Sequence, residues 1–160
     1  MTPDTILDKT FIYTNQTWTE GPTLNFRRRD HACGVINING HNHIMVSGGF
    51  INDESKGSTT IESLDVKNLS QGWQHGLPDD PYFGLPRGLI GHTLAELPTQ
   101  SLMIVGGAYF EEHFFESSDE ILKLDFFQGK PTWVELNRLG GHGRYSTVAM
   151  LVPDNGTLCN

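Results

Sequence analysis

Paired glycines and single tryptophans recur along this 160-residue chain at a nearly constant interval. The tryptophans, separated by 55 and 60 residues, are Trp18, Trp73 and Trp133. Two Gly-Gly pairs, 58 residues apart, each close an apolar run, and they are Gly48-Gly49 and Gly106-Gly107. A period of this length is typical of repeat architectures, in which each unit is one small supersecondary structure.

Each unit is expected to contain four short strands, which we label a to d in chain order. Runs of β-branched and apolar residues predict the strands, and no segment shows a sustained helical period. In the first unit the strands are expected at 31–38, 44–47, 61–66 and from Trp73 onwards. In the second unit they are expected at 91–97, 102–105, 121–125 and 133–136. Four-stranded units at this interval are typical of β-propeller blades.

The glycine pairs follow strand b and have a structural explanation. Glycine permits a close approach between strands and a backbone conformation that other residues disfavour. Neither pair belongs to a G-x-G-x-x-G or P-loop motif and neither precedes a helix, so the pairs do not indicate a phosphate site. Asn39-Gly40 predicts the hairpin turn between strands a and b of the first unit.

Glycine pairs after strand b, a strand c of mixed polarity and a tryptophan in strand d together resemble the kelch repeat family. The resemblance extends over nearly the whole chain and implies an all-β fold of kelch-type β-propeller blades, each a four-stranded antiparallel sheet. A kelch blade usually also carries a tyrosine a few residues before its tryptophan. Tyr13 stands in that relation to Trp18, whereas the later units have Leu64 and Leu124.

The resemblance divides the single segment 1–160 into two full blades with partial blades on either side. The expected parts are a partial blade at 1–26, blades at 27–80 and 81–140, and the start of a further blade at 141–160. A closed propeller needs at least about four blades. We therefore expect the remaining blades of a longer protein, or self-association, to complete the ring and to cover the exposed blade faces.

The repeated side chains are expected to be structural. The tryptophans should pack between adjacent blades, where a buried ring contributes several kcal/mol at roughly 25 cal/mol per Å². Arg29, Arg87 and Arg144 recur at intervals of 58 and 57 residues. They are expected to pair with blade carboxylates such as Asp65 or Asp125, because a buried guanidinium needs a carboxylate partner. An exposed ligand clamp is the alternative.

Charge and hydropathy exclude two classes of partner. The formal net charge of −8 repels phosphate backbones, and the only basic cluster is Arg27-Arg28-Arg29, so nucleic acid is not an expected partner. No run of about 18 apolar residues predicts a membrane span. The first residues also lack the pattern of a signal peptide.

The cysteines leave the compartment open. Cys33 and Cys159 are neither a disulfide framework nor a zinc motif, and either a single bridge or two separate thiols fits them. Glycosylation sequons occur at Asn15, Asn68 and Asn155, a number close to chance. The cytoplasm is slightly favoured, and secretion stays an alternative.

A binding site is expected in the loops, because the strands are committed to packing. Antiparallel strands place the b–c and d–a connections on one face, and these are the long ones. The exposed aromatic residues predicted there to contact another protein are Tyr82, Phe83, Tyr109, Phe110, Phe114 and Phe115. The alternative is that these rings pack beneath their own loops. Acids in the second b–c loop would steer a basic or mixed partner surface towards it.

Catalytic and metal-binding patterns are weak. His41-x-His43 places two imidazoles near each other but has no third ligand nearby in sequence. His31 and His92 occupy equivalent places in the repeat, so packing explains them better than catalysis. No nucleophile elbow or catalytic cysteine context is present. We therefore expect no cofactor, no metal and no catalytic residue.

The sequence thus predicts a non-enzymatic protein–protein interaction module that binds through the b–c and d–a loops of a β-propeller. One alternative is a piece of a kelch-propeller enzyme with a metal-dependent site. Another is a purely architectural repeat array.

Overall fold

The computed structural model describes residues 6–51, 56–99, 101–111, 114–146 and 148–149. Its regular structure there is β-strand, apart from one short 3-10 helix, η1 (Leu69–Gln71). No helix among these residues is long and apolar enough to span a membrane. The predicted all-β class is therefore confirmed.

The first unit forms a four-stranded antiparallel sheet in chain order, here called the first sheet. Its strands are β4 (Ala32–Ile38), β5 (His41–Ser47), β7 (Ile61–Asp65) and β8 (Gln74–His75). They correspond to strands a to d of the sequence prediction. Asn39 and Gly40 form the β4–β5 turn with φ of 52° and 81°, as expected for an Asn-Gly hairpin.

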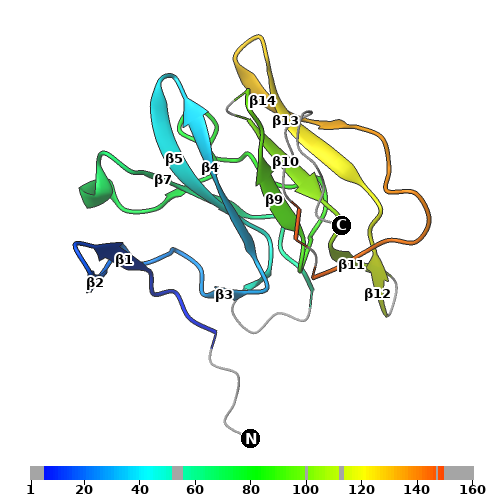
Figure 1. Ribbon diagram of the computed structural model, residues 1–160, viewed down its shortest axis with the longest axis horizontal. Coiled ribbons are helices and arrows are strands. Elements are labelled where there is room, and N and C mark those ends of the chain that lie inside the picture. The colour runs from blue at the N-terminus through cyan, green and yellow to red at the C-terminus, as the bar shows by residue number, and fades with distance from the viewer. Residues whose placement is uncertain (1–5, 52–55, 100, 112–113, 147, 150–160) are drawn as a thin grey trace, which may run out of the picture.

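The second unit repeats this order in the second sheet. Its strands are β9 (Thr93–Glu96), β10 (Leu102–Val105), β13 (Ile121–Phe127) and β14 (Lys130–Glu135). The first strands of the two sheets, β4 and β9, lie against each other (Figure 1). Neither sheet closes on itself.

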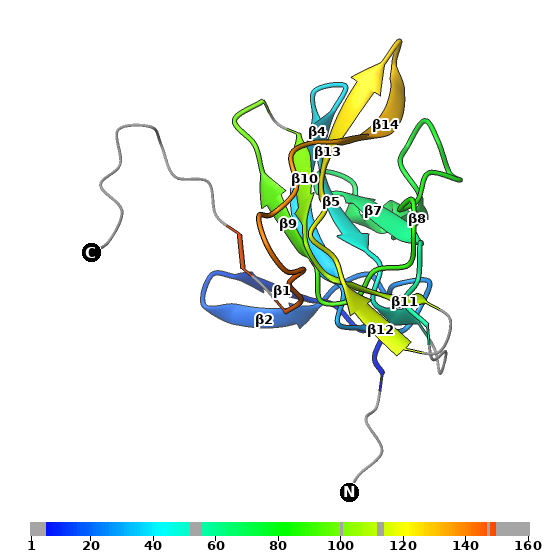
Figure 2. The same ribbon diagram turned by 90° about the vertical axis from the view of Figure 1, so that its right-hand side faces the viewer.

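Three two-stranded pairs accompany the sheets. They are β1 (Phe11–Thr14) with β2 (Thr17–Glu20), β3 (Arg28–Arg29) with β6 (Phe50–Ile51), and β11 (Ala108–Glu111) with β12 (Phe114–Ser117). The β11–β12 pair lies at the same end of the molecule as β3 in Figure 1, and Figure 2 shows the pair at the lower end of the second view. The β3–β6 and β11–β12 pairs both contain residues of the predicted b–c loops.

The main hydrophobic core lies between the two sheets. Because side chains alternate along a strand, one face of each sheet supplies it. The first sheet contributes Ile36, Ile38, Met45 and Ile61, and the second contributes Leu94, Leu102, Ile104, Leu122 and Leu124. A smaller cluster on the other face of the first sheet joins Leu24, Val46, Leu64 and Trp73.

Three backbone positions mark equivalent points in successive units. Asp30, Gly91 and Ser146 all have positive φ, at 56°, 56° and 53°. The Gly91 amide donates to the Asp30 carbonyl at 2.9 Å, and the Ser146 amide donates to the Gly91 carbonyl at 2.7 Å. One hydrogen bond therefore recurs from the first unit to the second and from the second to the start of a third.

The glycine pairs make the next contacts between units. Gly49 donates to the carbonyl of Leu89 at 2.8 Å, and Gly107 donates to that of Arg144 at 2.7 Å. Both glycines have positive φ, and a Cβ on either would collide with an adjacent residue. These contacts match the structural explanation that the sequence predicts for the pairs.

These contacts correct the alignment of the repeated arginines. Leu89 lies two residues before Gly91, and Arg144 lies two residues before Ser146. Arg28 lies two residues before Asp30 in the same way. The equivalent residues are therefore Arg28, Leu89 and Arg144. The grouping of Arg29 and Arg87 with Arg144 is wrong because the connections before the two sheets differ in length, and spacing alone cannot detect that.

Arg29 and Arg87 do pair with carboxylates, but with neither Asp65 nor Asp125. Arg28 forms the buried ion pair, donating to Glu62 at 2.6 Å with both side chains 0% exposed. Arg29 instead pairs with its exposed neighbour Asp30 at 2.9 Å, and Arg87 pairs with Glu120 at 3.1 Å. The preference of a buried guanidinium for a carboxylate is satisfied, but by a residue that the sequence analysis did not select.

The three tryptophans occupy equivalent positions but differ in burial. Trp18 lies opposite Tyr13 and Trp133 lies opposite Leu124 in the strand register, and Trp73 packs with Leu64. Trp73 is 7% exposed, whereas Trp18 is 66% exposed. The burial predicted for the tryptophans is therefore found for Trp73 and in part for Trp133, but not for Trp18.

Candidate functional site

The b–c loops of the two units meet through their aromatic residues. Phe50, directly after the first glycine pair, contacts Phe115 of β12 edge to face, with ring centroids 5.7 Å apart. Phe115 also contacts Phe110 of β11 at 5.2 Å. We call Phe50, Phe110, Phe114 and Phe115 the aromatic surface.

Two rings of the aromatic surface face solvent. Phe114 is 55% exposed and Phe115 is 42% exposed, whereas Phe50 is buried and Phe110 is half-buried. The buried Phe50 therefore supports Phe115 from below. Exposed rings on a packed base can enter a partner's pocket with little loss of side-chain entropy, since their positions are already restricted.

Cations lie over the rings of this region. The guanidinium of Arg29 is 4.3 Å from the Phe50 centroid, and that of Arg87 is 4.5 Å from the Tyr109 centroid. The Lys56 ammonium is 5.5 Å from the Phe110 centroid. Such contacts hold cations at the edge of the apolar patch.

A groove of about 400 Å³ runs beside these cations. Its walls are Lys56, Gly57, Arg87, Gly88, Tyr109, Phe110 and Glu111. Backbone from both units forms its floor, because a Cβ on Gly57 would contact Gly88 at 3.0 Å. The groove thus depends on the packing of one unit against the next.

The acids predicted to make this loop negative are largely paired. Glu120 contacts Arg87 at 3.1 Å, and Arg138 contacts Asp119 at 3.1 Å. Glu116 accepts a hydrogen bond from the Tyr109 hydroxyl at 3.2 Å. Burial first, and then Glu116, raise the pKa of Tyr109 above its usual value. The surface is therefore of mixed charge.

The d–a connection does not bring its aromatic residues to the same place. Asp79 accepts a hydrogen bond from Asn39 at 3.0 Å, so this part of the connection lies at the β4–β5 turn, away from the b–c loops. Tyr82 nearby is 95% exposed. Phe83 stacks on Trp133 at 5.7 Å and packs against the core, as the alternative of rings beneath their own loop describes.

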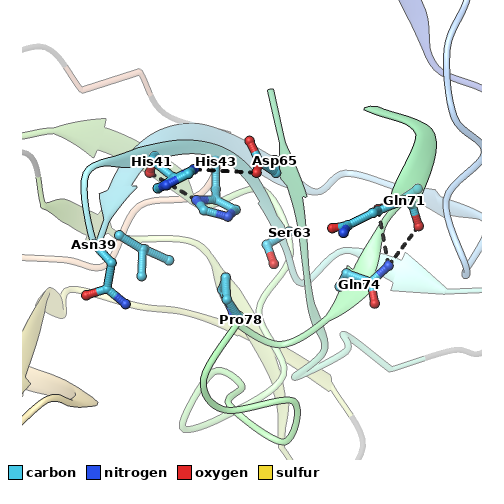
Figure 3. A pocket seen from close by; sticks show the side chains of 10 residues that line it. Asn39, His41, His43, Ser63, Asp65, Gln71, Gln74 and Pro78 are labelled. Carbon is cyan, nitrogen blue, oxygen red and sulfur yellow. Dashed lines mark hydrogen bonds and ion pairs between the residues drawn. The ribbon is translucent and has the colours of Figure 1, made fainter. Parts of the chain in front are cut away.

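A cavity of about 540 Å³ lies against the first sheet near the same turn. Figure 3 shows His41, His43, Ser63 and Asp65 along its wall. His43 Nδ1 lies 3.0 Å from the His41 carbonyl, which can only accept, so Nδ1 carries the proton and Nε2 is an acceptor in the neutral ring. His41 Nδ1 is 3.7 Å from Asp65.

Among the described residues, the side chains that line this cavity do not form a complete set of metal ligands. In the part of the chain that the structure describes, no three His, Cys, Asp or Glu side chains are grouped so as to hold a metal ion. Zinc sites use three or four protein ligands. His41-x-His43 therefore gains a carboxylate neighbour in Asp65 but no complete ligand set.

His92 is fully enclosed at the junction between the sheets. It is 4% exposed, and its Nε2 lies 2.8 Å from the Ser47 hydroxyl of β5. Burial, with a smaller contribution from His31, lowers the pKa of His92 to about 4. This environment agrees with the packing role predicted for the residue.

Other predicted features lie at the margins. Cys33 is an exposed free thiol, and Asn15 is exposed in the β1–β2 turn. Cys159 and Asn155 lie outside the described residues. Phe50, Lys56 and the Arg28–Glu62 pair were not selected from the sequence. Only the position of Phe50 directly after Gly49, mirrored by Ala108 after Gly107, could have indicated it.

Comparison with protein-family models and with curated proteins finds no match. The functional argument therefore depends on the geometry alone.

Proposed function

We propose that this chain is a segment of a kelch-type β-propeller and that it binds another protein, without catalysis, through its aromatic surface. Two sheets of four antiparallel strands in chain order, linked by a recurring set of hydrogen bonds, support the blade assignment. The glycine pairs at the ends of the second strands support it further.

The contact of Phe50 with Phe115 carries the binding proposal. It joins the b–c loops of both units into one patch that contains the exposed Phe115. The next ring in β12, Phe114, is exposed as well. Exposed aromatic residues beside cations and a groove are the composition that protein interfaces favour over the rest of a surface. In the second b–c loop the strands β11 and β12 already pair through their backbones, so the solvent-facing rings are not needed to hold these strands together.

Affinity capture tests this proposal. The wild-type protein and the double variant Phe114→Ala/Phe115→Ala are used as baits, with bound proteins identified by mass spectrometry. Phe127→Ala is the matched control, because Phe127 is 71% exposed at the far turn between β13 and β14. A partner that the control retains and the double variant loses supports the proposal. Identical capture by all three baits overturns it.

A metal-dependent enzyme is the competing function, and the cavity beside His41 and His43 is where its site would lie. Elemental analysis of the purified protein separates the two. Stoichiometric copper or iron that is lost in the variant His43→Gln would favour the enzyme. Its absence, together with partner capture through Phe114 and Phe115, would favour the interaction module.

A further inference from the structure

The packing of the second sheet on the first shows what covers a sheet face in this molecule. The covered face of the first sheet contains Met45 and Ile61, which are 0% and 2% exposed. The strands β13 and β14 help to cover it with Leu122, Leu124 and Trp133, which belong to the same core. The packing of the second sheet on the first therefore serves as the template for how another element could cover an equivalent sheet face.

The outer face of the second sheet is equivalent to that covered face, and no element among the described residues covers it. Counting back from the glycine pairs makes Met103 equivalent to Met45, and the strand register makes Ile121 equivalent to Ile61. Both are half-buried. Beside them, Val134 and Leu136 are 42% and 41% exposed, and a shallow hollow contains Met103, Ile121 and Leu136.

The hairpin β1–β2 repeats the covering element. The pair of Tyr13 with Trp18 matches that of Leu124 with Trp133. The hairpin also meets the first unit as the first unit meets the second. Leu24 donates to the Asp8 carbonyl at 2.9 Å, and Leu85 donates to the Thr59 carbonyl at 2.8 Å.

The covering residues of the hairpin are uncovered themselves. Phe11, Tyr13 and Trp18 are 57%, 58% and 66% exposed, although their partners in the template are buried or partly buried. An apolar face at one end of the molecule thus matches an apolar element at the other. The sheet face is complementary to the hairpin, but neither surface is complementary to a second copy of itself. Association between copies is therefore head to tail.

We infer that the β1–β2 hairpin of one copy of this chain covers the outer face of the second sheet of another copy. Arg144 and Ser146 already occupy the entry positions of a further unit on that side, through their bonds to Gly107 and Gly91. Lys123 on this face occupies the position equivalent to Ser63 in the first sheet. In the associated pair it lies against the aromatic rings of the other copy's hairpin, whose faces attract a cation. The inference does not depend on the aromatic surface.

Two single variants test the inference, one on each surface. Trp18→Glu blocks the hairpin, and Val134→Glu blocks the sheet face. Both residues are exposed in the free chain, so neither substitution disturbs its own core, and unchanged circular dichroism verifies this. Tyr82→Glu is the control, because Tyr82 is 95% exposed in the connection between the two sheets and belongs to neither surface.

Molar mass is measured by light scattering during size-exclusion chromatography. The wild type and the control are expected to associate with increasing concentration. Each blocked variant alone is expected to be monomeric, with an apparent Kd raised by more than about tenfold. An equal mixture of the two blocked variants should form a dimer and nothing larger, because one intact hairpin then meets one intact face.

Two results overturn the inference. The first is a wild-type chain that stays monomeric at every concentration. The second is a blocked variant that associates alone while the mixture shows no new species, since that would mean like surfaces meet like.

Discussion

The two four-stranded sheets share one backbone plan and differ in how they fill one buried position. In the first unit this position holds the ion pair between Arg28 and Glu62. In the second unit the equivalent residues are Leu89 and Leu122, which are 1% and 6% exposed. The same fold therefore holds either an ion pair or two apolar side chains at this position, provided that buried charged groups are paired with each other.

The difference extends to the backbone next to the pair. Glu62 also accepts hydrogen bonds from the backbone and side-chain nitrogens of Asn25, at 2.7 and 2.8 Å. The residue equivalent to Asn25 in the second unit is Pro86, which has no N–H. The second unit therefore lacks both the carboxylate of Glu62 and the backbone N–H of Asn25 that donates to it.

The largest expected effect comes from breaking the ion pair on one side. Glu62→Leu leaves Arg28 charged and buried and removes the acceptor of Asn25, so we expect a loss of about 3–5 kcal/mol in the free energy of unfolding. Urea denaturation at low protein concentration measures it. Glu20→Leu, at an exposed ion pair, is the control and should change stability by less than about 1 kcal/mol. Equal losses in both variants would contradict the comparison.

The tryptophans extend the comparison to the β1–β2 hairpin. Trp73→Ala removes a buried ring and its hydrogen bond to the Pro22 carbonyl, so we expect a loss of about 3 kcal/mol. Trp18→Ala in the monomeric chain should cost less than about 0.5 kcal/mol, because its ring is already in solvent. Thermal unfolding of both variants measures the difference. A large loss in the Trp18 variant would show that the hairpin is packed.

Acid should weaken the junction between the two sheets. The pKa of His92 is about 4 in the folded chain and near 6.5 when unfolded. Below pH 6.5, His92 is therefore protonated in the unfolded chain but stays neutral in the folded chain. The free energy of unfolding falls as the pH decreases, until the pH approaches 4. The expected loss between pH 7 and pH 5 is about 2 kcal/mol.

Denaturation curves at several pH values measure that loss, and His92→Gln should remove most of the slope between pH 6.5 and pH 4. Ser47→Ala is the companion variant, because it keeps the titrating ring and removes its partner. A slope that persists unchanged in His92→Gln would assign the acid sensitivity to other groups.

The smallest effect is expected from making the first unit resemble the second. The combined variant Arg28→Leu/Glu62→Leu/Asn25→Pro removes the ion pair together with its donor. We expect its unfolding free energy to lie within about 1 kcal/mol of the wild-type value, because replacement of a buried ion pair by apolar residues is often neutral or stabilising. Urea denaturation beside Glu62→Leu checks this. A combined variant as unstable as the single one would mean that the two positions are not equivalent.

Much of the fold could be predicted from local patterns. Asn39-Gly40 and the alternating run after Ile61 indicated a turn and a strand that the structure confirms. The glycine pairs were predicted to permit close approach, and they do so at Leu89 and Arg144. The alignment of the arginines could not be predicted, because connections of unequal length displace them from a constant period.

The candidate site was less accessible to sequence reasoning. Phe114 and Phe115 were selected, and both are exposed. Phe83 was selected as well, but it packs against Trp133. Loop residues follow no period, so their exposure depends on which other segment lies beneath them.

By itself the sequence determined the repeat, the all-β class and the places where glycine is needed, because these depend on short-range backbone preferences and on the spacing of like residues. Only the tertiary structure decided which tryptophan is buried, which arginine pairs with Glu62 and which loops meet at Phe50 and Phe115. Burial and pairing depend on contacts between residues tens of positions apart, and equivalent residues differ there because one has a neighbouring sheet and another has solvent.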